Sequence, residues 1–307
     1  MKSLVYKSTG SWYLLKNEKG EIYNARIKGK FKIDNITSTN PIAVGDWVEA
    51  DIEEGEESIV ITKIYDRENY ITRQSPHNKH LHHIVAANLD QSILLVTLKD
   101  PKTSTGFIDR FLVASEAYHV PATIVFNKTD LHKEKEKVKF EKVKDIYEKI
   151  GYPVYAMSIN ENKGIQEVKE LLKNKTTLIS GHSGVGKSSF INTILPENIS
   201  KTQEVSEWSG KGLHTTTFAE MFDLPFGGKI IDTPGMREFA MMDIEPHELS
   251  HYFPEMKVLI NDCRFNNCMH IEEPGCAVKA AVEENRISPD RYISYLNILE
   301  SIDNKKW

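Results

Sequence analysis

The sequence predicts a multi-domain protein in which a small β-barrel is followed by an α/β domain and an α-helical, metal-binding C-terminal domain. Three observations predict this order. Short runs of β-branched and aromatic residues fill the N-terminal part, apolar strands then alternate with amphipathic helices, and cysteine and histidine residues gather near the C-terminus. We expect domain boundaries at residues 1–70, 71–236 and 237–307.

Five short strands are expected in the N-terminal domain, at residues 5–6, 12–15, 22–27, 44–48 and 59–64. Turn-forming residues separate them. Five strands in so short a segment suit a closed barrel of the OB-fold type, and a small SH3-like barrel is the alternative.

The middle of the chain alternates between two patterns. Continuous apolar runs, as buried parallel strands require, lie at 92–98, 122–126, 154–157 and 177–180. Helical spacing follows at 107–117, 133–150, 165–172 and from residue 187 onward. This alternation predicts a doubly wound α/β sheet. The Lys/Glu run at 133–144 is interpreted as a solvated helix face with i,i+4 pairing. Beyond residue 235 we expect no strand, only helices at 245–253, 277–284 and 289–303.

A phosphate-binding loop is the sharpest motif. The segment reads Gly181-His182-Ser183-Gly184-Val185-Gly186-Lys187-Ser188, followed by Ser189, and matches G-x-x-x-x-G-K-[ST] between a predicted strand and helix. Glycines let successive N–H groups turn toward phosphate oxygens, and the helix N-terminus adds partial positive charge. Lys187 would neutralise the β- and γ-phosphates, and the Ser188 hydroxyl would ligate Mg²⁺. The alternative is a glycine-rich turn with an exposed lysine.

The segment Asn127-Lys128-Thr129-Asp130 predicts that the base is guanine. It follows an apolar strand, so it lies where ligands of α/β sheets bind. The Asp130 carboxylate can accept hydrogen bonds from N1–H and the exocyclic amine of guanine, whereas adenine would leave it unpaired. Ser158, after the next strand, is placed to bring backbone N–H groups to guanine O6, and an ordinary loop serine is the alternative.

A third motif, Asp232-Thr-Pro-Gly235, ends another apolar strand. Asp232 is suited to hold Mg²⁺ through water, and the Gly235 N–H to sense the γ-phosphate. The order of the motifs is permuted, because GTPases of the Ras type place the phosphate loop first and the guanine-reading motif last. Here the guanine-reading motif comes first. We therefore expect a circularly permuted P-loop GTPase domain.

The machinery for hydrolysis is less complete. Met236 stands where Ras-type enzymes have a water-orienting glutamine, and a thioether cannot orient water. His214 is the best substitute, with a contact to a partner or solvent as the alternative. Thr216, narrowly preferred to Thr217, is expected to close on Mg²⁺. With Lys187, these residues form the expected catalytic set.

The three cysteines of the chain lie in one segment, as Cys263-x₄-Cys268-x-His270-x₅-Cys276. Three thiolates and one imidazole form a closed tetrahedral zinc site, which is structural because no position remains for water. The alternative is a loop with unrelated buried cysteines. His77, His80, His82 and His83 form a second histidine group, which we interpret as a polar linker.

Composition limits the function classes. The 307-residue chain is 40% hydrophobic and 27% charged, and its net charge of −5 argues against a generic polyanion binder. We see neither a bilayer-spanning stretch nor a secretion signal, so we expect a cytoplasmic protein without membrane association. Eight of the first 33 residues are Lys or Arg and two are acidic, with aromatics interleaved. This pattern suits an RNA-gripping barrel surface and equally a solvated barrel face.

Together these motifs, the HTTT stretch at 214–217 and the Gly45-Asp-Trp-Val48 segment of the barrel resemble the ribosome small-subunit-dependent GTPase A family (RsgA, also called YjeQ) over essentially the whole chain. The resemblance implies an OB-fold, a permuted GTPase domain and a zinc domain. It also implies nucleotide contacts at 127–130 and 181–189, and zinc at Cys263, Cys268, His270 and Cys276. One departure is Ile159, where the guanine loop commonly has alanine.

The resemblance further implies binding to the small (30S) ribosomal subunit and its 16S rRNA in late maturation, with hydrolysis of GTP to GDP stimulated by the subunit. We expect a monomer. Two other functions stay open at this point. One is a GTP-switched rRNA-binding scaffold with little turnover, which Met236 favours, and the other is a permuted GTPase of large-subunit assembly.

Overall fold

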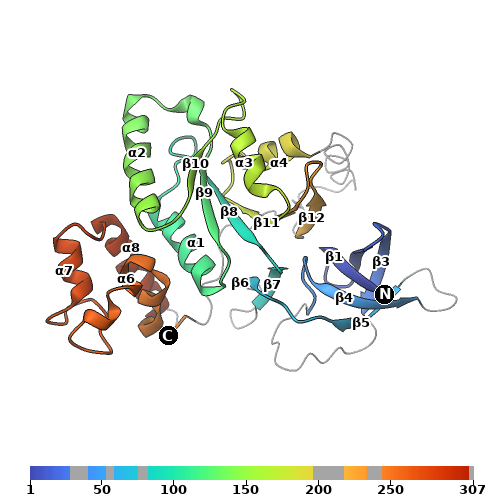
Figure 1. The fold of residues 1–307 in the computed structure, drawn as a ribbon, viewed down its shortest axis with the longest axis horizontal. Coiled ribbons are helices and arrows are strands. Elements are labelled where there is room, and N and C mark those ends of the chain that lie inside the picture. The colour runs from blue at the N-terminus through green and yellow to red at the C-terminus, as the bar shows by residue number, and fades with distance from the viewer. Residues whose placement is uncertain (28–40, 53–58, 75–81, 196–217, 234–243, 304–307) are drawn as a thin grey trace.

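The computed structural model describes residues 1–27, 41–52, 59–74, 82–195, 218–233 and 244–303. Figure 1 shows an N-terminal barrel and a C-terminal helical domain on two sides of a central α/β domain. None of the helices in these ranges is long and apolar enough to cross a membrane.

The N-terminal strands close into a barrel. They are β1 (Lys2–Ser8), β2 (Tyr13–Asn17), β3 (Ile22–Ile27), β4 (Trp47–Ile52) and β5 (Ile59–Ile64). Their order is β1-β2-β3-β5-β4, and β4 pairs back onto β1. The β3–β5 pair is parallel. Inward-facing residues such as Val5, Leu15 and Ile61 are fully buried and fill the interior. The closed five-stranded order confirms the OB-fold expectation over the SH3-like alternative.

One expected barrel strand starts later than predicted. The strand predicted at 44–48 runs instead from Trp47 to Ile52, because Val44 leaves the barrel to bridge Ala86. Gly45 makes this possible with a φ of 92°, since a Cβ there would lie 2.1 Å from the Ala87 carbonyl oxygen. The neighbouring Asp46 is buried and forms an ion pair with Arg67 at 2.6 Å.

The α/β domain has a six-stranded sheet in the order β10-β9-β8-β11-β13-β12. The strands are β8 (Gln91–Val96), β9 (Ala122–Phe126), β10 (Val154–Ala156), β11 (Thr176–Ser180), β12 (Glu220–Asp223) and β13 (Lys229–Asp232). All neighbours are parallel except β12, which runs antiparallel to β13. The central strand β8 is buried at every position, because helices cover both faces of the sheet.

The helices of this domain are α1 (Thr105–Ala117), α2 (Glu134–Lys149), α3 (Ile165–Leu172) and α4 (Lys187–Ile194), with a short 3₁₀ turn η1 (Thr129–Leu131). Alternate residues of β8 point to opposite faces. Leu94 and Val96 pack in one cluster with α1 and α2, whereas Ile93 and Leu95 pack in another with α3 and α4. This arrangement confirms the doubly wound prediction.

Two features were not predicted. β6 (Tyr70–Gln74) and β7 (His82–Ala87) form an antiparallel hairpin between barrel and α/β domain. The interpretation of the histidine group as a linker is therefore wrong for His82 and His83, which begin β7, while His77 and His80 lie outside the described residues.

The short strand β12 was also missed. It pairs with β1 at Lys7–Glu220, so barrel and α/β domain share one 11-stranded sheet.

Side chains reinforce the contact between β1 and β12. Lys7 Nζ lies 2.8 Å from a Glu220 oxygen, and the Tyr6 hydroxyl donates to Asp223 at 2.8 Å. Lys16 of β2 also pairs with Asp223. The barrel is thus bound to the edge strand β12 of the α/β sheet by ion pairs and a hydrogen bond as well as by backbone pairing.

Within residues 244–303 the chain is helical, without a strand, as predicted. The elements are η3 (Pro246–Tyr252), α6 (Pro254–Lys257), η4 (Ile260–Asp262), α7 (Ala277–Glu283) and α8 (Pro289–Asp303). The segment predicted as a helix at 245–253 is a 3₁₀ helix. Leu249, Phe253 and Ile298 form a core that Val113 of α1 joins, so this domain packs on α1.

Candidate nucleotide and metal sites

The phosphate loop connects β11 to α4. Two of its glycines are required by neighbours: a Cβ on Gly181 would lie 2.6 Å from the Leu95 carbonyl oxygen, and one on Gly186 would lie 2.4 Å from Asn127 Nδ2. Gly186 also has a φ of 95°. Because α4 begins at Lys187, its N-terminal N–H groups open toward the loop.

Lys187 joins the loop to the end of β13. Its ammonium lies 2.6 Å from Asp232 Oδ1 and donates to the Thr233 carbonyl at 3.1 Å. Both charged side chains are largely buried, with exposed fractions of 14% and 12%. β11 and β13 are parallel neighbours, so the phosphate loop and the D-x-x-G strand end at the same edge of the sheet.

The segment 127–130 follows β9 at that same edge. Buried Asn127 donates from Nδ2 to the Val185 carbonyl at 2.8 Å, which joins the guanine-reading segment to the phosphate loop. Lys128 has a φ of 59° and donates to the Asp100 carbonyl at 2.6 Å. Thr129 Oγ1 donates to the Met157 carbonyl at 3.0 Å. Two motifs far apart in the chain are thus joined by a direct hydrogen bond from Asn127.

The carboxylate of Asp130 is held in its charged form. It accepts from Ser158 Oγ at 2.7 Å and from Asn160 Nδ2 at 3.1 Å. The Ser158 hydrogen bond is the main cause that lowers the pKa of Asp130. Ser158 is fully buried, and its own N–H donates to the Lys163 carbonyl at 2.9 Å. Its side chain therefore orients the carboxylate that would read guanine.

A contribution that the sequence reasoning missed comes from the loop after β8. Thr103 Oγ1 lies 2.6 Å from His182 Nε2, and the Phe107 ring meets the imidazole edge-on at 5.4 Å. A Cβ on Gly184 would lie 3.3 Å from Pro101. The loop after β8 thus packs against the phosphate loop. The sequence could have indicated this contact, because the loop follows the carboxyl end of a central strand, where ligands of α/β sheets bind.

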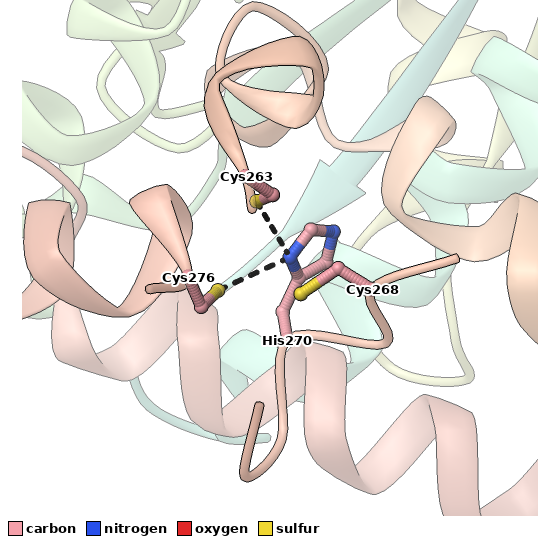
Figure 2. A group of neighbouring side chains, drawn as sticks. All are labelled: Cys263, Cys268, His270 and Cys276. Carbon is pink, nitrogen blue, oxygen red and sulfur yellow. Dashed lines mark hydrogen bonds between the residues drawn. The ribbon is translucent and has the colours of Figure 1, made fainter. Parts of the chain in front are cut away.

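The predicted metal ligands lie together in the C-terminal domain, as Figure 2 shows. The ligand atoms of Cys263, Cys268, His270 and Cys276 all lie within 4.8 Å of one another. His270 Nδ1 is 3.6 Å from Cys263 Sγ and 3.3 Å from Cys276 Sγ. Ligands about 2.1–2.3 Å from a tetrahedral ion have separations of roughly this size.

The surroundings of the cluster also fit a metal. Burial is the main cause that raises the pKa of Cys268 to about 12 and that raises the pKa of Cys276. A bound cation would displace the thiol protons and stabilise the thiolates, which burial disfavours when no ion is present. Hydroxyl groups of α8 hold the ligand loop: Tyr292 donates to the His270 carbonyl at 2.6 Å and Tyr295 to the Met269 carbonyl at 2.8 Å. The cluster can hold a metal ion.

Family models match most of the chain: RsgA N-terminal domain over residues 2–60 and RsgA GTPase over residues 64–242. The chain belongs to the RsgA GTPase family. It is therefore a GTP-hydrolysing enzyme, as the sequence predicted.

Relatives and solved structures agree with this membership. The small ribosomal subunit biogenesis GTPase RsgA of Flavobacterium psychrophilum is 51% identical over 99% of this chain and 94% of its own, and that of Phocaeicola vulgatus is 50% identical over 100% and 99%. YjeQ from Thermotoga maritima is 36% identical, with a TM-score of 0.76 and coverage of 98% and 97%. YloQ, described as a circularly permuted GTPase, is 27% identical, with a TM-score of 0.75 and coverage of 99% and 95%. These likenesses confirm the permuted RsgA fold.

His214, Thr216, Gly235 and Met236 lie outside the described residues. The remaining predicted residues of the two nucleotide-binding motifs, together with Ser158 and Asp232, lie at one edge of the sheet.

Proposed function

We propose that this chain acts in late maturation of the small (30S) ribosomal subunit, hydrolysing GTP to GDP and phosphate with stimulation by that subunit. The observation that carries the proposal is the hydrogen bond from Asn127 to the Val185 carbonyl. It joins the guanine-reading segment, which contains the Asp130 carboxylate, to the phosphate loop. The full-length likeness to small ribosomal subunit biogenesis GTPases supplies the biological setting.

In this proposal the nucleotide lies across residues 127–130, Ser158 and 181–189. Asp130 accepts from guanine N1–H and the exocyclic amine, and the charged state that Ser158 favours suits that task. The backbone of the phosphate loop binds the phosphates, and Lys187 exchanges its contact with Asp232 for phosphate oxygens. This exchange keeps its ammonium paired throughout.

Hydrolysis would use a magnesium ion held by Ser188 and Thr216, and through water by Asp232. When bound, Mg²⁺ neutralises charge on the β- and γ-phosphates. We assign water positioning to His214 and γ-phosphate sensing to the Gly235 N–H. Because Met236 cannot orient water, we expect slow intrinsic turnover that depends on the subunit.

We further propose that the metal of the C-terminal cluster is one structural Zn²⁺, bound by Cys263, Cys268, His270 and Cys276. Three thiolates and an imidazole are a ligand set that zinc prefers, and four protein ligands exclude water from the ion. The same proposal includes contact with 16S rRNA, a monomeric state and a cytoplasmic location. It also includes three domains, with limits at 1–70, 71–236 and 237–307.

The test measures phosphate release by the full-length protein with GTP, alone and with purified small or large subunits. We expect stimulation by small subunits, and cosedimentation of the GTP-loaded protein with them. A Lys187→Ala variant controls for contaminating GTPases. Absence of stimulation, with binding retained, would favour the switched scaffold. Stimulation by large subunits alone would refute the choice of subunit.

A further inference from the structure

Four lysines gather beside the guanine-reading segment, and the nucleotide chemistry does not use them. Lys99 and Lys102 lie in the loop after β8, and Lys135 and Lys139 lie in the first two turns of α2. We call these four residues the lysine cluster. Lys102 and Lys135 are exposed, and the other two are half-buried.

Two structural features bring the cluster together. The Lys128 ammonium binds the Asp100 carbonyl at 2.6 Å, which holds the loop after β8 against the segment from which α2 begins. Lys135 and Lys139 are four residues apart on α2, so they share one face of the helix. Their mutual proximity has an electrostatic effect: burial lowers the pKa of Lys139, and the like charges of Lys102 and Lys135 lower it further.

The other lysines in the body of α2 differ in one respect. Lys137 pairs with Glu134 at 2.7 Å, Lys144 with Glu148 at 3.9 Å and Lys149 with Asp145 at 2.7 Å. Lys142 pairs with Asp290 of α8 at 3.4 Å. Across the part of the chain that the structure describes, no carboxylate lies within 4.0 Å of an ammonium nitrogen of the lysine cluster. The i,i+4 pairing expected for residues 133–144 therefore does not include the cluster lysines.

The like charges of the lysine cluster repel one another. Glu136 interacts with Lys99, Lys135 and Lys139, but it forms no ion pair with them among the residues that the structure describes. A polyanion would relieve their mutual repulsion. Lysine ammonium groups act as point charges on flexible stems, which suits phosphate oxygens along a nucleic-acid backbone and reads no base sequence.

We propose that the lysine cluster binds the phosphodiester backbone of ribosomal RNA, which provides the GTPase domain with an RNA contact beside its nucleotide. The inference rests on the proposed function, because it takes the small subunit as the source of the RNA. The contact would adjoin the guanine-reading segment directly, since Lys128 ties the loop of Lys99 and Lys102 to that segment. RNA bound there is positioned to stabilise the arrangement that holds guanine.

The test is a double variant, Lys135→Gln/Lys139→Gln, in the full-length protein. Glutamine keeps the helix propensity and most of the stem while removing two charges. Each phosphate contact contributes about 0.7–0.9 to the slope of log affinity against log salt, so each lysine is worth about fivefold at roughly 0.15 M salt. We expect small-subunit affinity to fall about 15- to 30-fold, with the slope reduced by about 1.4–1.8.

The matched control is Lys144→Gln/Lys149→Gln, which removes two paired charges from the same helix. It should bind subunits like the unmodified protein. Both double variants should keep basal GTPase activity and melting temperature, since neither pair touches the nucleotide motifs.

Equal binding and equal salt dependence of the cluster variant would overturn the inference. A loss of affinity with an unchanged salt slope would point to a ribosomal protein and would also overturn it. An equal loss of subunit affinity in both double variants would show that the effect depends only on the net charge of the protein. That result would also overturn the inference. If the unmodified protein itself failed to bind small subunits, the proposed function would be the part that fails.

Discussion

Arg291 of α8 is the most informative residue to remove, because it is buried between two carboxylates at the junction of the C-terminal and α/β domains. Its guanidinium lies 2.7 Å from Asp109 of α1 and 2.6 Å from Glu255 of α6, and its side chain is 2% exposed. Replacing it in Arg291→Met leaves both carboxylates without a cation. Breaking a buried pair of this kind costs about 3–5 kcal/mol, a large part of the roughly 5–15 kcal/mol that stabilises a typical domain.

The assay is urea unfolding followed by far-ultraviolet circular dichroism, with Lys142→Met as the matched control. That variant breaks another ion pair to α8, but the side chains of Lys142 and Asp290 are 70% and 51% exposed. We expect it to cost less than about 1 kcal/mol. Equal destabilisation by the two variants would refute the reasoning.

The cost of Arg291→Met should also depend on pH. Burial already raises the pKa of Asp109, and Arg291 opposes that shift. Without the arginine the pKa of the folded state rises further above its unfolded value. The folded variant then favours the protonated acid, so its stability falls as pH rises. The difference from the unmodified protein should be larger at pH 8 than at pH 5.

Three other predictions concern the sites. Gly186→Ala should weaken guanine-nucleotide binding by about 10- to 100-fold, because its Cβ would lie 2.4 Å from Asn127 Nδ2 at a positive φ, and titrations with fluorescent GDP and GTP analogues measure this. Unchanged affinity would contradict the close approach. Asp130→Asn should cost about 10- to 100-fold in guanine-nucleotide affinity with little change in melting temperature, because an amide cannot accept both guanine donors. An equal loss for ATP would argue against base reading. Cys268→Ser should lose its metal and destabilise the C-terminal domain, and metal analysis by mass spectrometry with unchanged zinc content would exclude the ligand set.

Local patterns predicted the elements with strong periodicity. The apolar runs that became β8, β9 and β11 were recognisable because strands buried on both faces need no polar side chain. β12 was missed because four residues with a half-exposed pattern carry little periodic signal. The β6–β7 hairpin was missed because His82 and His83 resemble a polar linker until the neighbouring strand is known.

The site, like the fold, has features that the sequence predicted and features that it did not. The residue types and spacing of 127–130, 181–188 and 263–276 were legible in the sequence, because phosphate, guanine and zinc each demand particular groups at short range. The contacts of Thr103 with His182 and of Lys128 with Asp100 were not legible. They join segments that approach only when parallel strands end at a common edge.

The chemistry of this protein is legible in its residue types and their spacing: the base it reads, the loop for phosphate, the cysteines and histidine that could hold a metal, and the permuted order of its motifs. The tertiary structure alone decided which charges are neutralised. Lys187 and Arg291 are paired with acids distant in the chain, whereas Lys135 and Lys139 have no such partner among the residues that the structure describes. The reason is that the strength of an ion pair depends on distance and burial, and both arise only when the elements pack.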